Sequence, residues 1–350
     1  RASLVLCLQI RSRFKEQLEG WGIKPEQTLV IATSALREAK NPDPITDRIF
    51  IKTGFKVRVI DGIEENRLMY LAVTNKIKLL SKKNVSEDSI ILEVGGGSTE
   101  MMLIKEGKMA GAHSLKIGTI RIEQNLNLPA ATNDDIRRYI HQFILNTKGS
   151  LNEDLDMSTV KQFYSVGGEP RLAAKTYGRQ IADGIWEISR KEYEKFVKEI
   201  ETYSPEELVA KFKIDYNEAS SLYIGLSIYE MFIQLTNVEK IIVLETNIRE
   251  GVIISQISKP SEELQSEFYS QITASAINLL RKYHGDLEHA FYVRDVSLKI
   301  FDTLKDEIGL DARTRMLLEV AGILHDIGMF IRLGDHQHHS QYIISNSEIF

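Results

Sequence analysis

Three consecutive glycines separate a short apolar run from Ser-Thr-Glu in residues 89–100, SIILEVGGGSTE. Because glycine has no Cβ atom, its backbone N–H groups can approach an anion closely, and carboxylates on both sides can hold a divalent cation, directly or through water. The residues with these roles are Glu93, Gly95, Gly96, Gly97, Ser98 and Glu100. The segment therefore predicts a phosphate-binding turn beside a cation, and a plain glycine-rich hairpin turn is the alternative.

Two adjacent carboxylates, Glu64 and Glu65, follow Asp61 at the start of an apolar helical pattern. Asp61 and Glu64 have the spacing of a capping box, so Glu64 can serve only to begin the helix. Glu65 has no such explanation, and a carboxylate at this position can act as a general base on water. A solvated helix start is the alternative for both residues.

Arg37 ends the sequence ATSALR, which follows an apolar run. A guanidinium binds oxyanions through a fork of N–H donors, so an arginine beside small hydroxyl residues suits contact with phosphate. The alternative is a helix capped by Thr33 or Ser34, with Arg37 on the surface.

A second strand-to-glycine turn occurs in the sequence SVGG, which contains Gly167 and Gly168. Two such turns in two parts of an α/β region predict a phosphate-binding loop from each part. Tight packing of a helix against a strand is the alternative, since glycine pairs also serve that purpose.

Histidines gather in the last part of the chain. His325 and Asp326 are adjacent in an apolar helical pattern, His289 precedes them, and three more histidines follow within 336–339. Imidazole and carboxylate groups are ligands of transition metals, so His289, His325 and Asp326 predict a metal-type site in a helical domain. A hydrogen-bonded histidine pair without metal is the alternative.

The elements that must position these residues alternate between strand and helix up to about residue 258. The predicted strands cover 28–32, 55–60, 89–94, 99–104, 109–114, 162–166, 240–244 and 251–256. The predicted helices cover 4–18, 63–80, 133–145, 190–200 and 217–235. Beyond a polar joint at 258–262 the strand pattern disappears, so we expect an α/β region followed by a helical domain.

Composition excludes several classes of protein. The chain has 350 residues, 43% hydrophobic and 27% charged, as in ordinary globular proteins. A net charge of −5 argues against DNA binding along the whole chain. The single cysteine, Cys7, excludes an intrachain disulfide and fits a cytoplasmic location. No apolar stretch is long enough to insert into a membrane.

Together, these motifs resemble the exopolyphosphatase/guanosine pentaphosphatase (Ppx/GppA) family. The matching pieces, in family order, are ATSALREAKN at 32–41, VIDGIEENRLMYLAV at 59–73, EVGGGSTE at 93–100, KIGTIR at 116–121, SVGG at 165–168 and IREG at 248–251. LHDIG at 324–328 and HHSQYIISNS at 338–347 match the helical HD-like domain of longer members. The resemblance covers nearly the whole chain.

The resemblance implies a fold and an activity. Two ribonuclease H-like (actin/hexokinase-like) domains, at 1–114 and 115–258, would face each other across a cleft, and a helical HD-like domain would occupy 262–350. Members of the family remove terminal phosphate from inorganic polyphosphate or guanosine pentaphosphate with a divalent cation, Mg²⁺. We therefore expect an exophosphatase, and the family suggests a homodimer.

The resemblance also assigns roles to single residues. Glu65 falls at the catalytic position, with its neighbour Glu64 as the second choice. The phosphate-binding residues would be Arg37, Gly95, Gly96, Gly97, Ser98, Gly167 and Gly168. Glu93 stands where the family has Asp and, with Glu100, would position the cation.

Two departures from the family leave other functions open: Glu93 replaces the usual Asp, and the family's first strand with its phosphate loop would precede Arg1. An HD-type domain would also supply a last Asp beyond Phe350. The alternatives to an exophosphatase are therefore a non-catalytic regulator that binds polyphosphate or an alarmone, and a phosphohydrolase centred on His289, His325 and Asp326.

Overall fold

The computed structural model describes residues 12–39, 41–80, 87–106, 108–126, 132–154, 156–257 and 262–347. Contacts divide the chain into two compact units, Arg1–Glu65 and Asn66–Phe350. The elements of the first unit are η1 (Pro25–Gln27), β1 (Val30–Ala32), α2 (Ser34–Arg37), α3 (Pro42–Thr53), β2 (Val57–Val59) and the start of α4 (Gly62–Ile77). Strands β1 and β2 pair in parallel, with Val30 opposite Val57.

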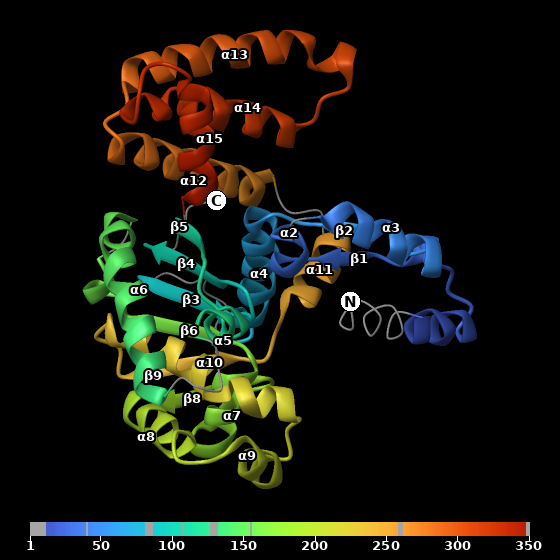
Figure 1. Ribbon diagram of the computed structural model, residues 1–350, viewed down its shortest axis with the longest axis vertical. Coiled ribbons are helices and arrows are strands. Elements are labelled where there is room, and N and C mark those ends of the chain that lie inside the picture. Colours follow the sequence, from blue (N-terminus) through green and yellow to red (C-terminus); the bar gives the residue numbers. More distant parts are fainter. Residues whose placement is uncertain are drawn as a thin grey trace. The chain divides into compact units, whose positions relative to one another are not determined.

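A seven-stranded sheet forms the centre of the second unit, in the order β5-β4-β3-β6-β9-β8-β7 (Figure 1). The strands are β3 (Ser89–Val94), β4 (Thr99–Lys105), β5 (Lys108–Leu115), β6 (Gln162–Val166), β7 (Arg179–Ala182), β8 (Ile185–Ser189) and β9 (Lys240–Leu244). Strands β3, β6 and β9 are parallel to one another. Their carboxyl ends lie at one edge, so the glycine turns after β3 and β6 leave the sheet on the same side.

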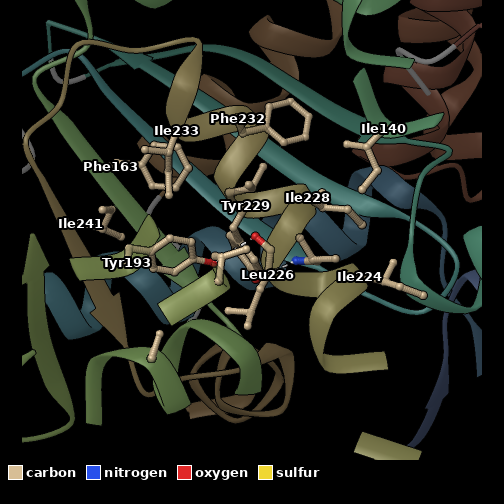
Figure 2. Close-up of a cluster of buried hydrophobic side chains, with 14 of the residues drawn as sticks. Ile140, Phe163, Tyr193, Ile224, Leu226, Ile228, Tyr229, Phe232, Ile233 and Ile241 are labelled. Carbon is tan, nitrogen blue, oxygen red and sulfur yellow. Dashed lines mark hydrogen bonds between the residues drawn. The ribbon is translucent and has the colours of Figure 1, made fainter. Parts of the chain in front are cut away.

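Helices pack around this sheet, and α10 (Tyr216–Gln234) is the most deeply buried of them. The others are α5 (Thr119–Leu126), α6 (Asn133–Asp154), α7 (Gly168–Tyr177), α8 (Arg190–Ile200) and α9 (Pro205–Phe212), with η2 (Met157–Thr159) before β6, and α11 (Ile248–Ile257) follows β9. Asp215 caps α10 by accepting a hydrogen bond from the Glu218 N–H. Figure 2 shows Tyr229 and Phe232 of α10 in the core with Phe163 of β6.

The last part of the chain is helical throughout its described residues, as predicted. It contains α12 (Glu262–Lys282), α13 (Leu287–Ile308), α14 (Ala312–Leu324), η3 (Ile327–Phe330) and α15 (His336–Asn346), drawn from orange to red in Figure 1. These helices enclose their own apolar cluster, which includes Ala276, Leu280, Ala290, Ile323 and Ile343. None of the helices described has the length and hydropathy that a membrane span requires.

Several predicted elements agree with the structure, and one prediction is wrong. Strands β3, β6 and β9 and helix α8 have the predicted bounds. The predicted strand at 251–256 lies inside helix α11. A short apolar run fits a strand or a helix equally well, and here Gly251 packs so closely on the Leu68 carbonyl of α4 that a Cβ would collide with it. Part of the predicted helix at 4–18 lies outside the described residues.

Strands β7 and β8 and helices α3, α5, α7 and α9 were not predicted. The sheet also crosses residue 114, where the sequence analysis places a domain boundary, because β3 pairs with both β4 and β6. The compact units divide after Glu65 instead. The three-domain division at 1–114, 115–258 and 262–350 therefore stays a prediction.

Candidate functional site

The first glycine turn is held from outside by the residues that follow β5. The N–H of Thr119 donates to the Gly95 carbonyl at 3.1 Å, and the N–H of Arg121 donates to the Gly96 carbonyl at 3.0 Å. The side chain of Arg121 donates from Nε to the Gly97 carbonyl at 2.8 Å. All three glycine carbonyls are therefore occupied by one short segment at the start of α5.

Gly118 makes this arrangement sterically possible. A Cβ at Gly118 would lie 2.6 Å from the Gly96 carbonyl oxygen and 2.7 Å from that of Gly95. Both carbonyls belong to the backbone and cannot swing away as a side chain would. The motif KIGTIR thus has a structural role in this protein: its glycine and the two N–H groups after it fasten the turn.

The N–H groups of the turn point elsewhere. Gly95 donates its N–H to the Ser98 carbonyl at 2.9 Å. Within the residues that the structure describes, no acceptor meets the N–H of Gly96 or Gly97. Two oriented backbone donors in a turn form a site for an anion, so the predicted phosphate-binding role of Gly96 and Gly97 has a geometric basis.

Glu93 and Glu100 face each other directly across β3 and β4. Residues paired in this way lie on the same face of the sheet, and two like charges there repel. Oε1 of Glu100, which is buried, accepts hydrogen bonds from the hydroxyls of Ser98 and Ser114, both at 2.8 Å. Glu93 is half-buried. A divalent cation would relieve the repulsion, so the carboxylate pair fits Mg²⁺, with Glu100 held in place by the two serines.

The second glycine turn is oriented by its own helix. Gly167 has a φ of 144°, which favours glycine, and Gly168 is the first residue of α7. The first N–H groups of an α-helix have no partner within the helix and attract anions. This helix start favours the predicted phosphate-binding role of Gly167 and Gly168, which stays a prediction.

One side chain joins the ends of the two strands that lead into these turns. The hydroxyl of Tyr229 accepts a hydrogen bond from the Val94 N–H at 2.9 Å and donates one to the Val166 carbonyl. Val94 is the last residue of β3, and Val166 is the last residue of β6. A Cβ at Gly167 would lie 2.8 Å from the same hydroxyl. The two turns are thus parts of one hydrogen-bonded assembly.

Glu65 and Arg37 meet in the first unit. Nη1 of Arg37 donates to Oε2 of Glu65 and to the Ile60 carbonyl, both at 2.9 Å. Burial raises the pKa of Glu65, while the Arg37 guanidinium opposes this shift. A buried carboxyl with a raised pKa and a fixed partner is typical of a catalytic acid or base.

The suggested capping of α2 is not observed, because Thr33 makes no side-chain cap hydrogen bond.

Glu64 makes one of the two hydrogen bonds of the predicted capping box, through its backbone N–H. Its N–H donates to Oδ1 of Asp61 at 2.8 Å, which begins α4. Its carboxylate lies 4.0 Å from the guanidinium of Arg58, whose side chain is half exposed. Of the two adjacent carboxylates, Glu65 is therefore the better candidate for catalysis, because it is buried, binds Arg37 and has a raised pKa.

The predicted histidine cluster is also assembled. Oδ2 of Asp326 lies 3.4 Å from Nε2 of His289 and 3.2 Å from Nε2 of His325. Oδ1 of Asp326 lies 3.2 Å from Nε2 of His336, which the sequence analysis did not assign to the site. His289 stands in the first turn of α13, where its N–H donates to the capping Asp286 at 3.0 Å. A cavity of about 320 Å³ opens beside His289, His325 and Asp326.

Close backbone packing brings these histidines together. A Cβ at Gly322 of α14 would lie 3.0 Å from Cα of Arg294 in α13, and a Cβ at Gly328 would collide with the His336 carbonyl of α15. The hydroxyl of Ser340 accepts from the Gly328 N–H at 2.9 Å and donates to the His325 carbonyl at 2.8 Å. Three helices therefore converge at Asp326.

Some site residues were missed by the sequence analysis. Gly118 and Arg121 lie in the motif KIGTIR, whose sequence alone assigns no definite role to either residue, and Tyr229 lies in an apolar helix without any local signal. Glu169 follows the second turn, and burial raises the pKa of its carboxyl. For Gly118 and Arg121, the sequence offers one signal of a role in the site: a glycine and a basic residue close together in KIGTIR.

Known families match nearly the whole chain. The Ppx/GppA phosphatase family matches residues 4–260, and Ppx/GppA phosphatase domain III matches residues 273–350. Similar curated proteins are guanosine-5'-triphosphate,3'-diphosphate pyrophosphatases of Aliivibrio fischeri and Photobacterium profundum, each 24% identical to this chain. The alignments cover 97% and 98% of this chain but 64% and 65% of those proteins, so the chain spans just under two-thirds of their length.

Two solved structures share the fold. An exopolyphosphatase from Cytophaga hutchinsonii has a TM-score of 0.63 at 19% identity, over 73% of this chain and 81% of that one. The Ppx/GppA family member of Aquifex aeolicus has a TM-score of 0.56 at 21% identity, over 75% and 83%. These likenesses confirm the predicted fold class, an actin-like α/β fold followed by a helical domain.

Proposed function

Because the chain belongs to the Ppx/GppA phosphatase family, we propose that it is an exophosphatase that hydrolyses the terminal phosphoanhydride bonds of inorganic polyphosphate, guanosine pentaphosphate, or both. The similar curated proteins are named for guanosine pentaphosphate, and one structural neighbour is named for polyphosphate. The observation that carries the proposal is the buried Glu65 carboxyl held by Arg37.

Hydrolysis of a phosphoanhydride depends mainly on positioning and on neutralising charge. The N–H groups of Gly96 and Gly97 would bind the terminal phosphate, and the start of α7 at Gly168 would bind a further phosphate group. Within the described residues, both hydrogen bonds of Arg37 use Nη1, and its other guanidinium N–H groups would bind a phosphate oxygen.

Glu65 would remove the proton of the attacking water. Burial raises the pKa of Glu65, which makes its carboxylate a stronger base than a solvated glutamate. This residue also argues against a regulator that only binds polyphosphate, because a carboxylate beside a polyanion weakens binding. A carboxylate at position 65 is better explained as the general base that activates the attacking water.

We also propose that Glu93 and Glu100, the carboxylate pair of β3 and β4, would hold Mg²⁺. The ion would neutralise the charge of the phosphate groups when bound. Glu93 has one more methylene than the family's Asp and would reach the ion through water, which Mg²⁺ loses reluctantly. The proposal also includes a cytoplasmic location and a homodimer; light scattering of the purified protein tests the dimer.

The test compares two adjacent carboxylates. Glu65→Gln should lower phosphate release from polyphosphate and guanosine pentaphosphate with Mg²⁺ by about 10²- to 10⁴-fold, since it removes the base and keeps the shape. Substrate binding should be unchanged or tighter, because a repulsive charge is lost. Glu64→Gln is the matched control and should retain most activity. If Glu65→Gln remains fully active, the role in activating water is wrong.

A second candidate function, a metal-dependent centre in the helical part, is favoured by one specific observation. Nδ1 of His325 lies 2.8 Å from the Gly322 carbonyl, which can only accept, so Nδ1 carries the proton. In a neutral imidazole the lone pair of Nε2 then faces Oδ2 of Asp326 at 3.2 Å. Only a cation, or a second proton on the ring, makes that contact favourable.

Two imidazoles and one carboxylate with further positions open suit Zn²⁺, Mn²⁺ or Fe²⁺ better than Mg²⁺. The ligand atoms of His289, His325 and Asp326 lie within 4.8 Å of one another. His336 contacts the other oxygen of Asp326 and would orient it, as outer partners of metal ligands do. Calorimetry with each ion should show one site per chain, which His325→Gln removes and His338→Gln, at an exposed position, does not. Equal binding by both variants would dismiss the centre.

A further inference from the structure

Strands β3 and β6 pair in parallel up to Glu93 opposite Val166, and then each strand turns away into its glycines. The Tyr229 hydroxyl lies between the two chains at this point. It uses its acceptor on the Val94 N–H and its donor on the Val166 carbonyl. A phenol is suited to this position because it offers both functions on one atom.

Tyr229 itself is held firmly. Its side chain is fully buried on α10, in the core that Figure 2 shows with Tyr193 and Phe232. Burial, together with the charges of Glu169 and Glu93, raises the pKa of Tyr229 well above its usual range, so the hydroxyl keeps its proton at all ordinary pH values. The donor to Val166 is therefore permanent.

We propose that Tyr229 is a positioning residue that sets the spacing between the two glycine turns, so that the phosphate groups bound by each are held in register. This inference rests on the proposed exophosphatase function. Gly167 supports it, because a Cβ there would lie 2.8 Å from the Tyr229 hydroxyl and would displace it. Glycine at 167 thus serves the contact with Tyr229 as well as its own φ of 144°.

The chain offers a matched control. Tyr193 is almost as fully buried, and its hydroxyl donates to the Leu226 carbonyl at 3.3 Å within the same core; among the described residues it makes no hydrogen bond to either turn. Tyr229→Phe and Tyr193→Phe each remove one buried hydroxyl and keep the ring. Tyr229→Phe removes two hydrogen bonds and Tyr193→Phe removes one, so both variants should be less stable, Tyr229→Phe more so. Turnover is therefore compared under conditions in which both variants are folded, and only Tyr229→Phe changes the spacing of the turns.

The first measurement is steady-state phosphate release with Mg²⁺. We expect Tyr229→Phe to lower kcat by about 10- to 100-fold, as small misplacements of bound groups do. KM should change by less than about threefold, since each turn still binds its phosphate and only their alignment is lost. Tyr193→Phe should keep both constants within about twofold. Equal kcat values for the two variants overturn the proposal.

Two further experiments apply if Tyr229→Phe does not fold or if the wild-type protein is inactive. If Tyr229→Phe does not fold, Gly167→Ala displaces the same hydroxyl and should give the same fall in kcat; unchanged turnover in Gly167→Ala then overturns the proposal. If the wild-type protein releases no phosphate, the proposed function fails on its own. Crystal structures of the two variants then decide: the distance between the Gly95–Gly97 turn and the Gly167–Gly168 turn should change in Tyr229→Phe and not in Tyr193→Phe, and an unchanged distance in Tyr229→Phe refutes the coupling.

Discussion

The two glycine turns look alike in sequence, but the protein holds them in different ways. The first turn leads back into an antiparallel strand, β4, and its three carbonyls are fastened by Thr119 and Arg121 from a distant segment. The second turn leads directly into α7, whose own helical geometry orients the backbone N–H groups. Only the first turn has a directly opposed pair of carboxylates on its flanking strands.

This difference shows that a strand followed by glycines indicates where the backbone can turn. The pattern does not indicate which contacts hold the turn in place. A helix orients its first N–H groups without help, because the carbonyls of the same residues already accept hydrogen bonds from N–H groups one turn later. A hairpin turn has no such internal order, so other residues must bind its carbonyls before its N–H groups face a ligand. Tyr229 contacts the strand ends before both turns. Apart from Tyr229, the first turn should be sensitive to changes in residues 118–121, and the second turn mainly to changes within it.

Among the changes that distinguish the two turns, Gly118→Ala should have the largest effect. The new Cβ would press on the carbonyls of Gly95 and Gly96, so the turn must move; we expect a loss of phosphate release of about 100-fold and a loss of about 1–3 kcal/mol in stability from overpacking. Gly20→Ala, where a Cβ meets nothing within 4 Å, is the control. If Gly118→Ala retains full activity, the first turn does not depend on this outside support.

The next effect concerns the cation, which only the first turn should position. Glu93→Gln keeps the shape of the side chain but loses its charge, so the Mg²⁺ concentration for half-maximal phosphate release should rise by about tenfold or more. Glu93→Asp should keep the activity, since the carboxylate remains. A Mg²⁺ titration that is unchanged in Glu93→Gln would remove Glu93 from the site.

A smaller effect is expected from Arg121→Lys, which loses the Nε donor to the Gly97 carbonyl. One hydrogen bond contributes about 0.5–1.5 kcal/mol, so kcat/KM should fall by about 2- to 10-fold. Arg171→Lys is the comparison near the second turn. Arg171 makes an exposed ion pair with Glu245 at 3.5 Å, so its replacement should have little effect. A larger loss in Arg171→Lys would reverse the contrast between the turns.

The smallest effect is on stability and belongs to the second turn. Burial raises the pKa of Glu169 above 4.5 in the folded protein, so the folded state binds more protons than the unfolded state just above that pH. The free energy of unfolding should therefore fall as the pH rises through this window. Glu169→Gln should flatten that part of a urea-midpoint curve between pH 4.5 and 7. An unaltered slope would show that Glu169 does not carry this linkage.

Much of the second unit could be predicted locally. Strands β3, β6 and β9 are short apolar runs bounded by polar or glycine residues, and their bounds agree with the structure. The strand at 251–256 failed because its apolar run carries no periodicity that separates a strand from a helix. Strands β7 and β8 are four and five residues long with mixed polarity, and at that length propensity gives little signal.

The sequence by itself determined where the backbone could turn and which charged groups stood beside the turns: the glycines at 95–97 and 167–168, Glu93, Glu100, and the pair Glu64 and Glu65. Capping spacing also separated Glu64 from Glu65, because it depends on residues three apart.

Only the tertiary structure decided what holds the turns and completes the clusters. Tyr229 reaches Val94 across 135 positions of the chain, Arg121 reaches Gly97 across 24, and His336 joins Asp326 through the packing of α15 on η3. Such contacts leave no trace in periodicity or propensity, since those patterns report on neighbours within a few residues. A buried hydroxyl finds its partners only when distant elements pack together, because an unpaired polar group in the core is costly and the fold must bring a donor or acceptor to it.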